Sequence, residues 1–158
     1  MILVIINDAK VRRAFETTVL RPMGSEILFA ENEKEGLELA LLRSPELILF
    51  GGKNMDITTK SILPVLHQYG SYSPVIYVSD ADDAALIEAF RLGIKDFIKL
   101  PLDEIEAKNI INRAIKNSAA SRENHLTNQK LLLEEAVRIT LTTLSHYLNN
   151  YLTALDGN

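Results

Sequence analysis

The sequence predicts an α/β fold built around a parallel β-sheet. Five short apolar runs recur along the chain, at residues 2–6, 26–30, 46–50, 74–78 and 94–98. They are rich in Ile, Leu, Val and Phe and mostly do not alternate with polar residues, which is typical of strands covered on both faces. Segments with helical periodicity separate these runs, and that alternation favours parallel strands joined by right-handed crossovers.

The first two helical segments follow the first and second apolar runs. The first segment ends at the Arg-Pro-Met-Gly sequence of residues 21–24, which cannot continue a helix. Its apolar residues at helical spacing are Val11, Ala14, Phe15 and Val19. The second segment begins at Asn32 and Glu35, whose spacing matches a capping box.

Three more helical segments follow the remaining runs. Pro64 lies in the third segment, which predicts either a kink or a helix that starts at Leu63. Gly93 is expected to end the fourth segment. The fifth begins after Pro101, and its apolar residues are Ile105, Ile110, Ile111 and Ile115.

Five strand–helix pairs in a chain of this length predict a flavodoxin-like (βα)5 fold. This is a doubly wound parallel sheet with strand order 2-1-3-4-5, here followed by a long C-terminal helix. Functional residues in such a sheet gather beyond the carboxyl ends of the strands. The sequences at those ends are Asn7-Asp8, Gly51-Gly52, Ser79-Asp80 and Lys99-Leu100-Pro101.

The composition sets limits on the class of protein. The formal net charge of −4 gives no general attraction to nucleic acid or to anionic membranes, and no basic cluster indicates DNA binding. The absence of cysteine excludes disulfides and thiolate metal sites. Residues 2–6 are too short for a signal peptide or a membrane span. We therefore expect a cytoplasmic protein without nucleic-acid or membrane partners.

The pattern changes near residue 118, which predicts a domain over residues 1–117 and a separate segment over residues 118–158. Residues 118–155 contain no glycine or proline and predict one long helix. Their apolar residues in alternating steps of four and three are Val137, Leu141, Leu144, Leu148, Tyr151 and Leu155. This narrow stripe is typical of a coiled-coil or bundle seam and predicts a homodimer. The alternative is an amphipathic helix that folds back onto the first domain.

Residues at the strand ends within 1–117 resemble those of response-regulator receiver domains. The residues that carry the resemblance are Asn7-Asp8, Gly51, Ser79, Phe97 and Leu100-Pro101. In that family these positions hold, in the same order, an acidic pair that binds Mg²⁺, the aspartate that accepts a phosphoryl group, a hydroxyl that steadies it, an aromatic switch residue, and a lysine before a proline. The resemblance implies two-component signalling, a receiver-like binding face at Asp8, Ser79 and Phe97, and a cis bond between Leu100 and Pro101.

Three positions depart from the receiver pattern. The first acid is an amide, the phosphoacceptor position is Gly51, and the lysine position is Leu100. Lys99 lies one residue early and is expected on the other face of its strand. Mg²⁺ requires several oxygen ligands, and phosphoryl transfer requires the metal and a cation to neutralise charge. We therefore expect a pseudo-receiver that accepts no phosphoryl group and binds no Mg²⁺ or other cofactor.

Other acidic residues near the strand ends are candidates for the same chemistry. Asp56 could replace the phosphoacceptor, but it lies in the loop beyond the strand end. Asp80, Asp82 and Asp83 resemble a metal-binding cluster. Acids in the first turn of a helix interact favourably with the helix dipole, and we expect that role for these three.

The C-terminal segment resembles the H-box of sensor histidine kinases. The matching residues are Ser145, His146, Leu148, Asn149, Asn150 and Leu152. The resemblance makes His146 the candidate phosphoacceptor, at an outward-facing heptad position where a neutral imidazole can act as a nucleophile. Tyr147 replaces the acid that normally follows the histidine, which weakens the case for autophosphorylation. Tyr151 replaces the helix-bending proline, which predicts a straighter helix.

The leading hypothesis is a two-component signalling protein. In it, a non-phosphorylatable receiver-like module binds protein partners and is coupled to a dimerising helix. No ATP-binding domain occurs in the sequence, so the chain alone is not expected to be an enzyme, although it could be a fragment of a histidine kinase. Two alternatives stay open: a phosphotransfer protein that uses His146, and a regulatory adaptor whose receiver face binds a small ligand.

Overall fold

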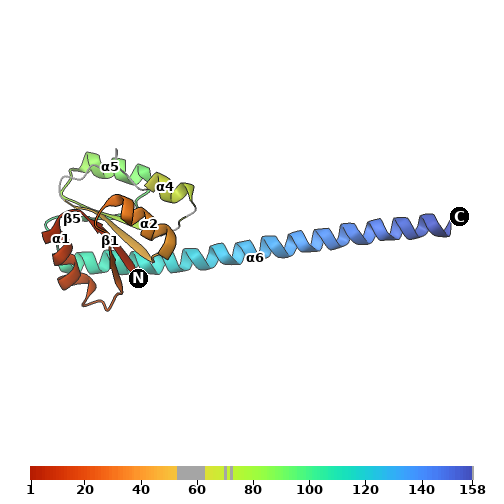
Figure 1. Ribbon diagram of the computed structural model, residues 1–158, viewed down its shortest axis with the longest axis horizontal. Helices are drawn as coiled ribbons and strands as arrows, with labels where there is room; N and C mark the ends of the chain where they lie inside the picture. Colours follow the sequence, from red (N-terminus) through yellow and green to blue (C-terminus); the bar gives the residue numbers. More distant parts are fainter. Residues whose placement is uncertain (53–62, 70, 72, 158) are drawn as a thin grey trace. The chain divides into compact units, whose positions relative to one another are not determined.

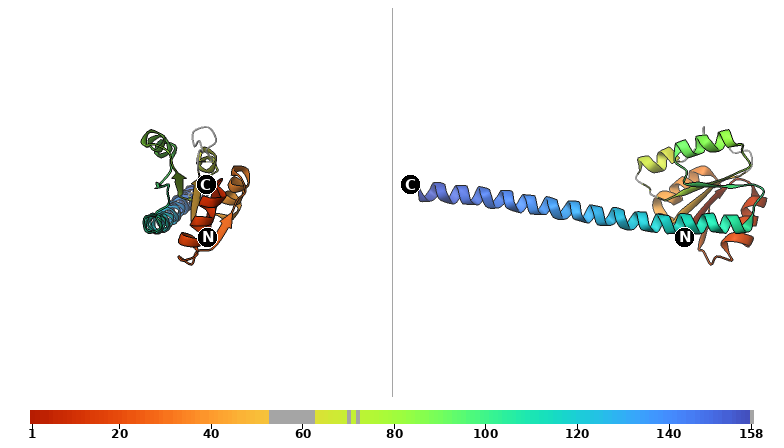
Figure 2. Two further views of the ribbon diagram at one scale, coloured as in Figure 1. Left: turned by 90° about the vertical axis from the view of Figure 1, so that its left-hand side faces the viewer. Right: turned by 180° about the vertical axis from the view of Figure 1, so that it is seen from behind.

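The computed structural model of the chain describes residues 1–52, 63–69, 71 and 73–157. The chain divides into two compact units, Met1–Ala119 and Ala120–Asn158. The first unit contains a sheet of five parallel strands in the order β2-β1-β3-β4-β5 (Figures 1 and 2). The predicted flavodoxin-like strand order 2-1-3-4-5 is confirmed.

Strand β1 lies where its apolar run predicted it, and the other four strands begin and end within two residues of their runs. Their bounds are β1 Ile2–Ile6, β2 Ile27–Phe29, β3 Leu47–Gly51, β4 Val75–Ser79 and β5 Asp96–Lys99. Every residue of β1, β3 and β4 is buried. The prediction of burial on both faces is wrong for β2 and β5, which are only partly buried because they form the edges of the sheet.

The helices connect the strands as predicted. Their bounds are α1 Ala9–Ala14, η1 Phe15–Leu20, α2 Glu33–Arg43, α4 Leu63–Gln68, α5 Asp83–Leu92 and α6 Glu104–Asp156. The first predicted helix continues from α1 into η1, a π-helix in which the Arg21 N–H donates to the Glu16 carbonyl at 3.0 Å. The Thr17 and Thr18 hydroxyls donate to carbonyls of the preceding turn, at 2.9 and 2.8 Å, which helps to satisfy acceptors that the wider turn leaves open.

Two hydrophobic cores hold the helices on opposite faces of the sheet. In one core, Val11 of α1 and Phe15 of η1 pack with Ile110 of α6 and with every second residue of the strands. In the other core, α2, α4 and α5 pack against the remaining strand residues, and Figure 1 shows these three helices together on one side of the sheet. Burial of each large side chain contributes about 1.5–3 kcal/mol, so the sheet depends on both layers.

Polar residues at the helix ends act largely as the sequence indicated. The Asn32 side chain accepts a hydrogen bond from the Glu35 N–H at 2.9 Å, which is the first half of the predicted capping box. The second half differs, because the Glu35 carboxylate accepts from the Glu31 N–H at 2.6 Å. Gly93 ends α5 with φ of 107°, in the left-handed region that favours glycine, as predicted.

Helix α6 joins two segments that the sequence pattern had separated. It runs without a break from Glu104 to Asp156. Its buried residues all lie in the first unit: Ala107, Ile110, Ile111, Ala114 and Ser118. From residue 123 to residue 157 every side chain is exposed. Among the described residues, no helix is long and apolar enough to cross a membrane.

Gly36 provides a test of how closely α2 approaches the sheet. A Cβ atom at this position would lie 2.4 Å from Ile5 Cδ1 and 2.7 Å from Ile5 Cγ1. We expect Gly36→Val to lower the free energy of unfolding by about 1–3 kcal/mol through overpacking, as measured by urea denaturation. Glu38→Val, at an exposed position of the same helix, is the control for helix propensity. Equal losses in the two variants would contradict the close approach.

Candidate functional site

The carboxyl ends of the central strands lie side by side, as the fold requires. The Asn7 N–H donates to the Gly51 carbonyl at 3.0 Å, and the Gly52 N–H donates to the Val78 carbonyl at 2.8 Å. On the other side of β4, the Leu100 N–H donates to the Ser79 carbonyl at 2.9 Å. The positions that correspond to the acidic pair, phosphoacceptor, hydroxyl and lysine of receivers are therefore brought to one edge of the sheet.

The backbone at the end of β3 leaves no space for a side chain. Gly51 has φ of 139° and Gly52 has φ of 128°, both in a region that L-residues rarely adopt. A Cβ atom on Gly51 would lie 2.1 Å from the Val78 carbonyl oxygen. A Cβ atom on Gly52 would lie 1.9 Å from Asn7 Oδ1. The sequence predicted a missing carboxylate here, whereas the structure shows that the backbone itself excludes a carboxylate.

Asp8, the remaining acid of the pair, caps helix α1. One of its carboxylate oxygens accepts hydrogen bonds from the Lys10 and Val11 N–H groups, at 2.9 and 3.0 Å. Two N–H donors at a helix start are strong partners for a carboxylate. Among the described residues, no group of three or more His, Cys, Asp or Glu could hold a metal ion. The expectation that the chain binds no Mg²⁺ stays a prediction.

Ser79 keeps the hydroxyl position, but its oxygen has a structural partner. The side chain is buried, and its Oγ accepts a hydrogen bond from the Ala81 N–H at 2.9 Å. Asp82 then caps α5 by accepting from the Ala85 N–H at 3.0 Å, and Asp83 lies in the first turn. Asp82 and Asp83 therefore stabilise a helix start, as the dipole interpretation predicted. The same prediction is wrong for Asp80, which lies before the N-cap and outside the first turn.

Leu100, at the lysine position, belongs to the hydrophobic core. It is 9% exposed and packs in the same core as Ile98. Lys99 is exposed, and alternation along β5 places it on the opposite face from Leu100. The Leu100–Pro101 bond is cis, as predicted. The side chain that would supply a cation at this strand end is therefore replaced by one that contributes to packing.

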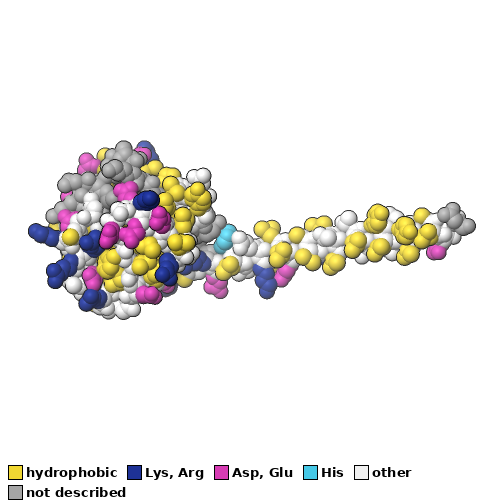
Figure 3. Space-filling view, viewed as in Figure 1, with side chains coloured by type: hydrophobic (Ala, Val, Ile, Leu, Met, Phe, Trp, Pro, Cys, Tyr) yellow, Lys and Arg dark blue, Asp and Glu magenta, His cyan; other side chains and the backbone are white. Residues whose placement is uncertain are grey.

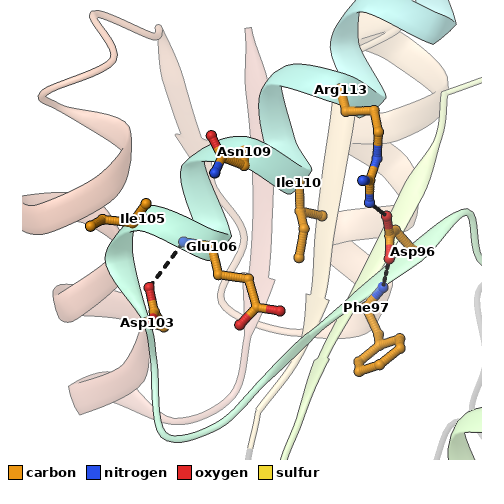
Figure 4. Close-up of a pocket in the computed structure, with 8 residues that line it drawn as sticks. All are labelled: Asp96, Phe97, Asp103, Ile105, Glu106, Asn109, Ile110 and Arg113. Carbon is orange, nitrogen blue, oxygen red and sulfur yellow. Dashed lines mark hydrogen bonds and ion pairs between the residues drawn. The ribbon is translucent and has the colours of Figure 1, made fainter.

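Phe97, at the aromatic switch position, lies beside a shallow pocket between β5 and the first turns of α6. Its ring meets that of Phe90 edge to face, with centroids 5.9 Å apart and planes at 84°. Figure 4 shows Phe97 and the ion pair between Asp96 and Arg113 at one side of the pocket, and Ile105 at the other. The pocket-lining residues are Asp96, Phe97, Asp103, Ile105, Glu106, Asn109, Ile110 and Arg113.

This region also carries exposed apolar side chains that the sequence did not identify as a surface. Ile105 is 74% exposed, Ile87 is 55% exposed and Phe90 is 44% exposed. Ile87, Phe90 and Phe97 lie on α5 and β5, and Ile105 lies across the pocket at the start of α6. We name these four residues the α5–β5–α6 patch. The apolar residues Leu86, Ile87, Ala89 and Phe90 of α5 are spaced so that they could all face the core. Only Leu86 and Ala89 do so, because the core side of α5 is narrower than its apolar stripe.

His146 lies in the second unit, on an exposed stretch of α6. Its neighbours one helical turn away are Thr142, Thr143, Asn149 and Asn150. No acid lies within four residues of it on this described helix, so α6 itself offers His146 no carboxylate base. The Thr143 hydroxyl donates to the Ile139 carbonyl at 3.0 Å. Asp56, the other candidate acceptor, lies outside the described residues.

Comparisons with known proteins identify the fold but not a family. No protein-family model matches the sequence, and no curated protein matches it. The Francisella response regulator 1452 receiver domain is 24% identical, with a TM-score of 0.64, over 74% of this chain and 97% of that domain. A CheY-like receiver domain protein from Methanospirillum hungatei is 19% identical, with a TM-score of 0.64, over 76% of this chain and 96% of that one.

A larger protein gives the same result. NtrX from Brucella abortus is 23% identical, with a TM-score of 0.65, over 77% of this chain and 28% of NtrX. At identities of 19–24% these similarities establish the fold, which is that of response-regulator receiver domains.

The geometry of Gly51 predicts that an aspartate placed at this position will destabilise the fold. We expect Gly51→Asp to lose about 2–5 kcal/mol of unfolding free energy, because a side chain there combines a strained φ with overpacking. Gly51→Ala should lose a similar amount in urea denaturation, since the Cβ atom is the cause. Gly24→Ala is the control, at φ of 68° with no atom within 4 Å of the added Cβ. A Gly51→Asp variant as stable as the parent would contradict this account.

Proposed function

We propose that the chain is a pseudo-receiver of a two-component signalling pathway. In this proposal the receiver-fold unit accepts no phosphoryl group and acts by binding protein partners, and its state is passed on through α6. The observation that carries the proposal is the backbone at Gly51, which has no space for the acceptor side chain. The receiver-type fold of the structural neighbours supports the choice of pathway.

The residues at the strand ends affect each of the groups that phosphoryl transfer requires. Phosphoryl transfer depends on an acceptor, on a metal held by acids, and on a cation that neutralises developing charge. Here the acceptor position is closed, Asp8 is bonded to the start of α1, and Leu100 is in the core. Each of these three positions has a packing or capping role instead. Restoring the group at one position would therefore leave the groups at the other two missing.

The α5–β5–α6 patch supports a role in protein binding. Exposed aromatic and aliphatic side chains of this size are typical anchors at protein interfaces. The Asp96–Arg113 ion pair and the polar side chains Glu106 and Asn109 at the same pocket provide a polar rim. The pocket is wide and shallow, which favours a protein surface over a small enclosed ligand. A ligand-binding adaptor remains the alternative.

The second unit supports self-association as the route for output. Its exposed leucines and tyrosines would be poorly solvated on a lone helix. A helix that joins one receiver-fold unit to another copy could transmit a change in partner binding between them. We place this assembly in the cytoplasm, which agrees with the absence of cysteine.

Phosphorylation of the receiver-fold unit can be tested directly. We expect no acid-stable mass shift and no acyl phosphate when the full chain is incubated with acetyl phosphate and Mg²⁺, because the acceptor position carries no carboxylate. Intact-mass spectrometry and hydroxylamine sensitivity would be measured beside a phosphorylatable receiver as a positive control. A hydroxylamine-sensitive adduct on residues 1–119 would contradict the proposal.

A second candidate function is phosphotransfer through His146. The observation that favours it is the full exposure of the His146 stretch on α6, together with the match of the flanking residues to an H-box. An exposed neutral imidazole is a competent phosphoryl acceptor near neutral pH. Since α6 supplies no carboxylate base, the donor or a partner protein would have to accept the proton.

Reaction with phosphoramidate, which phosphorylates histidine, would test this second function. We expect an acid-labile phosphoryl group that His146→Gln removes and that His125→Gln, on an exposed stretch of the same helix, leaves in place. The readout is intact-mass spectrometry at neutral pH, repeated after acid treatment. Labelling that is unchanged in His146→Gln would exclude His146 as the acceptor.

A further inference from the structure

The last part of α6 has a broad apolar surface and few charges. Between residues 137 and 155, nine large apolar side chains are 49–70% exposed. No Asp, Glu, Lys or Arg occurs from residue 139 to residue 155. Figure 3 shows hydrophobic side chains over much of the visible surface of this part of the helix. A surface of this kind requires a partner, because it has neither charges nor burial to stabilise it in water.

Two heptad seams overlap on this surface. A central column, seven residues apart, consists of Val137, Leu144 and Tyr151. On one side it is flanked by Leu141, Leu148 and Leu155, which completes the seam that the sequence stripe indicated. On the other side it is flanked by Thr140, Tyr147 and Ala154, which completes a second seam with the same column.

The second seam changes the number of neighbours that the helix needs. At about 100° per residue, the large apolar side chains from Tyr147 to Leu152 cover an arc of about 140°. A two-stranded coiled coil requires only one narrow seam, whereas bundle helices are also apolar at flanking heptad positions. Each helix is therefore suited to contact two neighbouring helices. The described residues of the second unit contain no other element that could supply them.

The charges at the two ends of the uncharged stretch select the direction of those neighbours. Arg138 precedes the stretch and Asp156 follows it. They are 18 residues apart, about five turns, so they lie on the same side of the helix. In a parallel pair each would lie level with its own like charge. In an antiparallel pair aligned over the stretch, Arg138 of one copy lies level with Asp156 of the next, and the helix dipoles also oppose favourably.

Arg138 already has one partner on its own helix. Its guanidinium donates to Glu135, at 3.1 Å from Nε, and holds the pKa of that carboxyl below its ordinary value. Both side chains are exposed. A guanidinium has five N–H donors, so it can keep this bond and bind a second carboxylate from another copy.

We propose that residues 137–155 of four copies of the chain form an antiparallel four-helix bundle. A ring in which every helix has two neighbours of opposite direction must contain an even number of helices, and four is the smallest such number. Identical uncharged surfaces meet in it without like-charge repulsion, and Arg138 meets Asp156 at both ends. The inference rests on the proposed self-association of α6 and replaces the expected two-stranded dimer. His146 lies opposite the apolar arc and stays exposed.

Sedimentation equilibrium of the full chain at micromolar concentration tests the number of copies. We expect a mass near 71 kDa, four times the chain mass of 17.7 kDa. Tyr147→Lys disrupts only the second seam and should reduce the assembly to a dimer. Leu148→Lys disrupts the first seam and should give dimers or monomers. Asn150→Lys, on the polar side of the same helix, is the matched control and should remain a tetramer.

Three results would overturn the inference. A dimeric parent whose mass does not change in Tyr147→Lys would show that one seam is used. A monomeric parent would show that the face does not bind other copies of the chain. A tetramer that persists in both Tyr147→Lys and Leu148→Lys would show that the assembly forms elsewhere on the chain. None of these outcomes affects the phosphodonor experiment, so the two proposals can fail separately.

Cysteine cross-linking tests the direction of the helices, because the chain has no cysteine of its own. Thr140 and Ala154 lie at equal distances from the centre of the uncharged stretch, at residue 147. Mixed Thr140→Cys and Ala154→Cys chains, distinguished by a tag on one of them, should form a disulfide between the two variants. A disulfide between two Thr140→Cys chains, formed as efficiently or better, would show parallel helices and overturn the inference.

Discussion

The burial of β1, β3 and β4 on both faces is the constraint on which the rest of the structure depends. A strand with apolar side chains above and below must be covered by helices on both sides, and this requirement generates the two cores. The parallel register that follows places the ends of these strands in one row, where backbone hydrogen bonds join Asn7 to Gly51 and Gly52 to Val78. The position of every residue at the candidate site results from this register.

At that row of strand ends, the side chains have bonding and packing roles that stabilise the fold. Asp8 caps α1, the Ser79 hydroxyl accepts a backbone N–H, and Leu100 fills the core. The double-glycine turn closes the acceptor position by its backbone conformation as well as by its missing side chain. The α5–β5–α6 patch lies outside this row, where Phe97 of β5 packs against Phe90 of α5.

Helix α6 serves two environments with one continuous backbone. Up to Ser118 most of its apolar residues complete a core of the receiver-fold unit, with Ile105 exposed, and beyond residue 122 its apolar residues are exposed. Sequence periodicity identified apolar stripes in both parts but could not show where the helix stops serving its own domain. Exposure also reveals that the distal apolar surface is wider than one seam, since Tyr147 and Leu152 are as open to solvent as the leucines of the stripe.

The sequence by itself determined the fold class, the strand order and most helix ends, because continuous apolar runs and capping residues act locally. It also located the strand-end residues, since the carboxyl ends of parallel strands share one edge. The folded structure was needed to show that Gly51 cannot carry a side chain, because the obstructing atom belongs to Val78 on the neighbouring strand. It likewise decided that Ile87, Phe90 and Ile105 are exposed, because the burial of a helical stripe depends on the width of the surface it packs against.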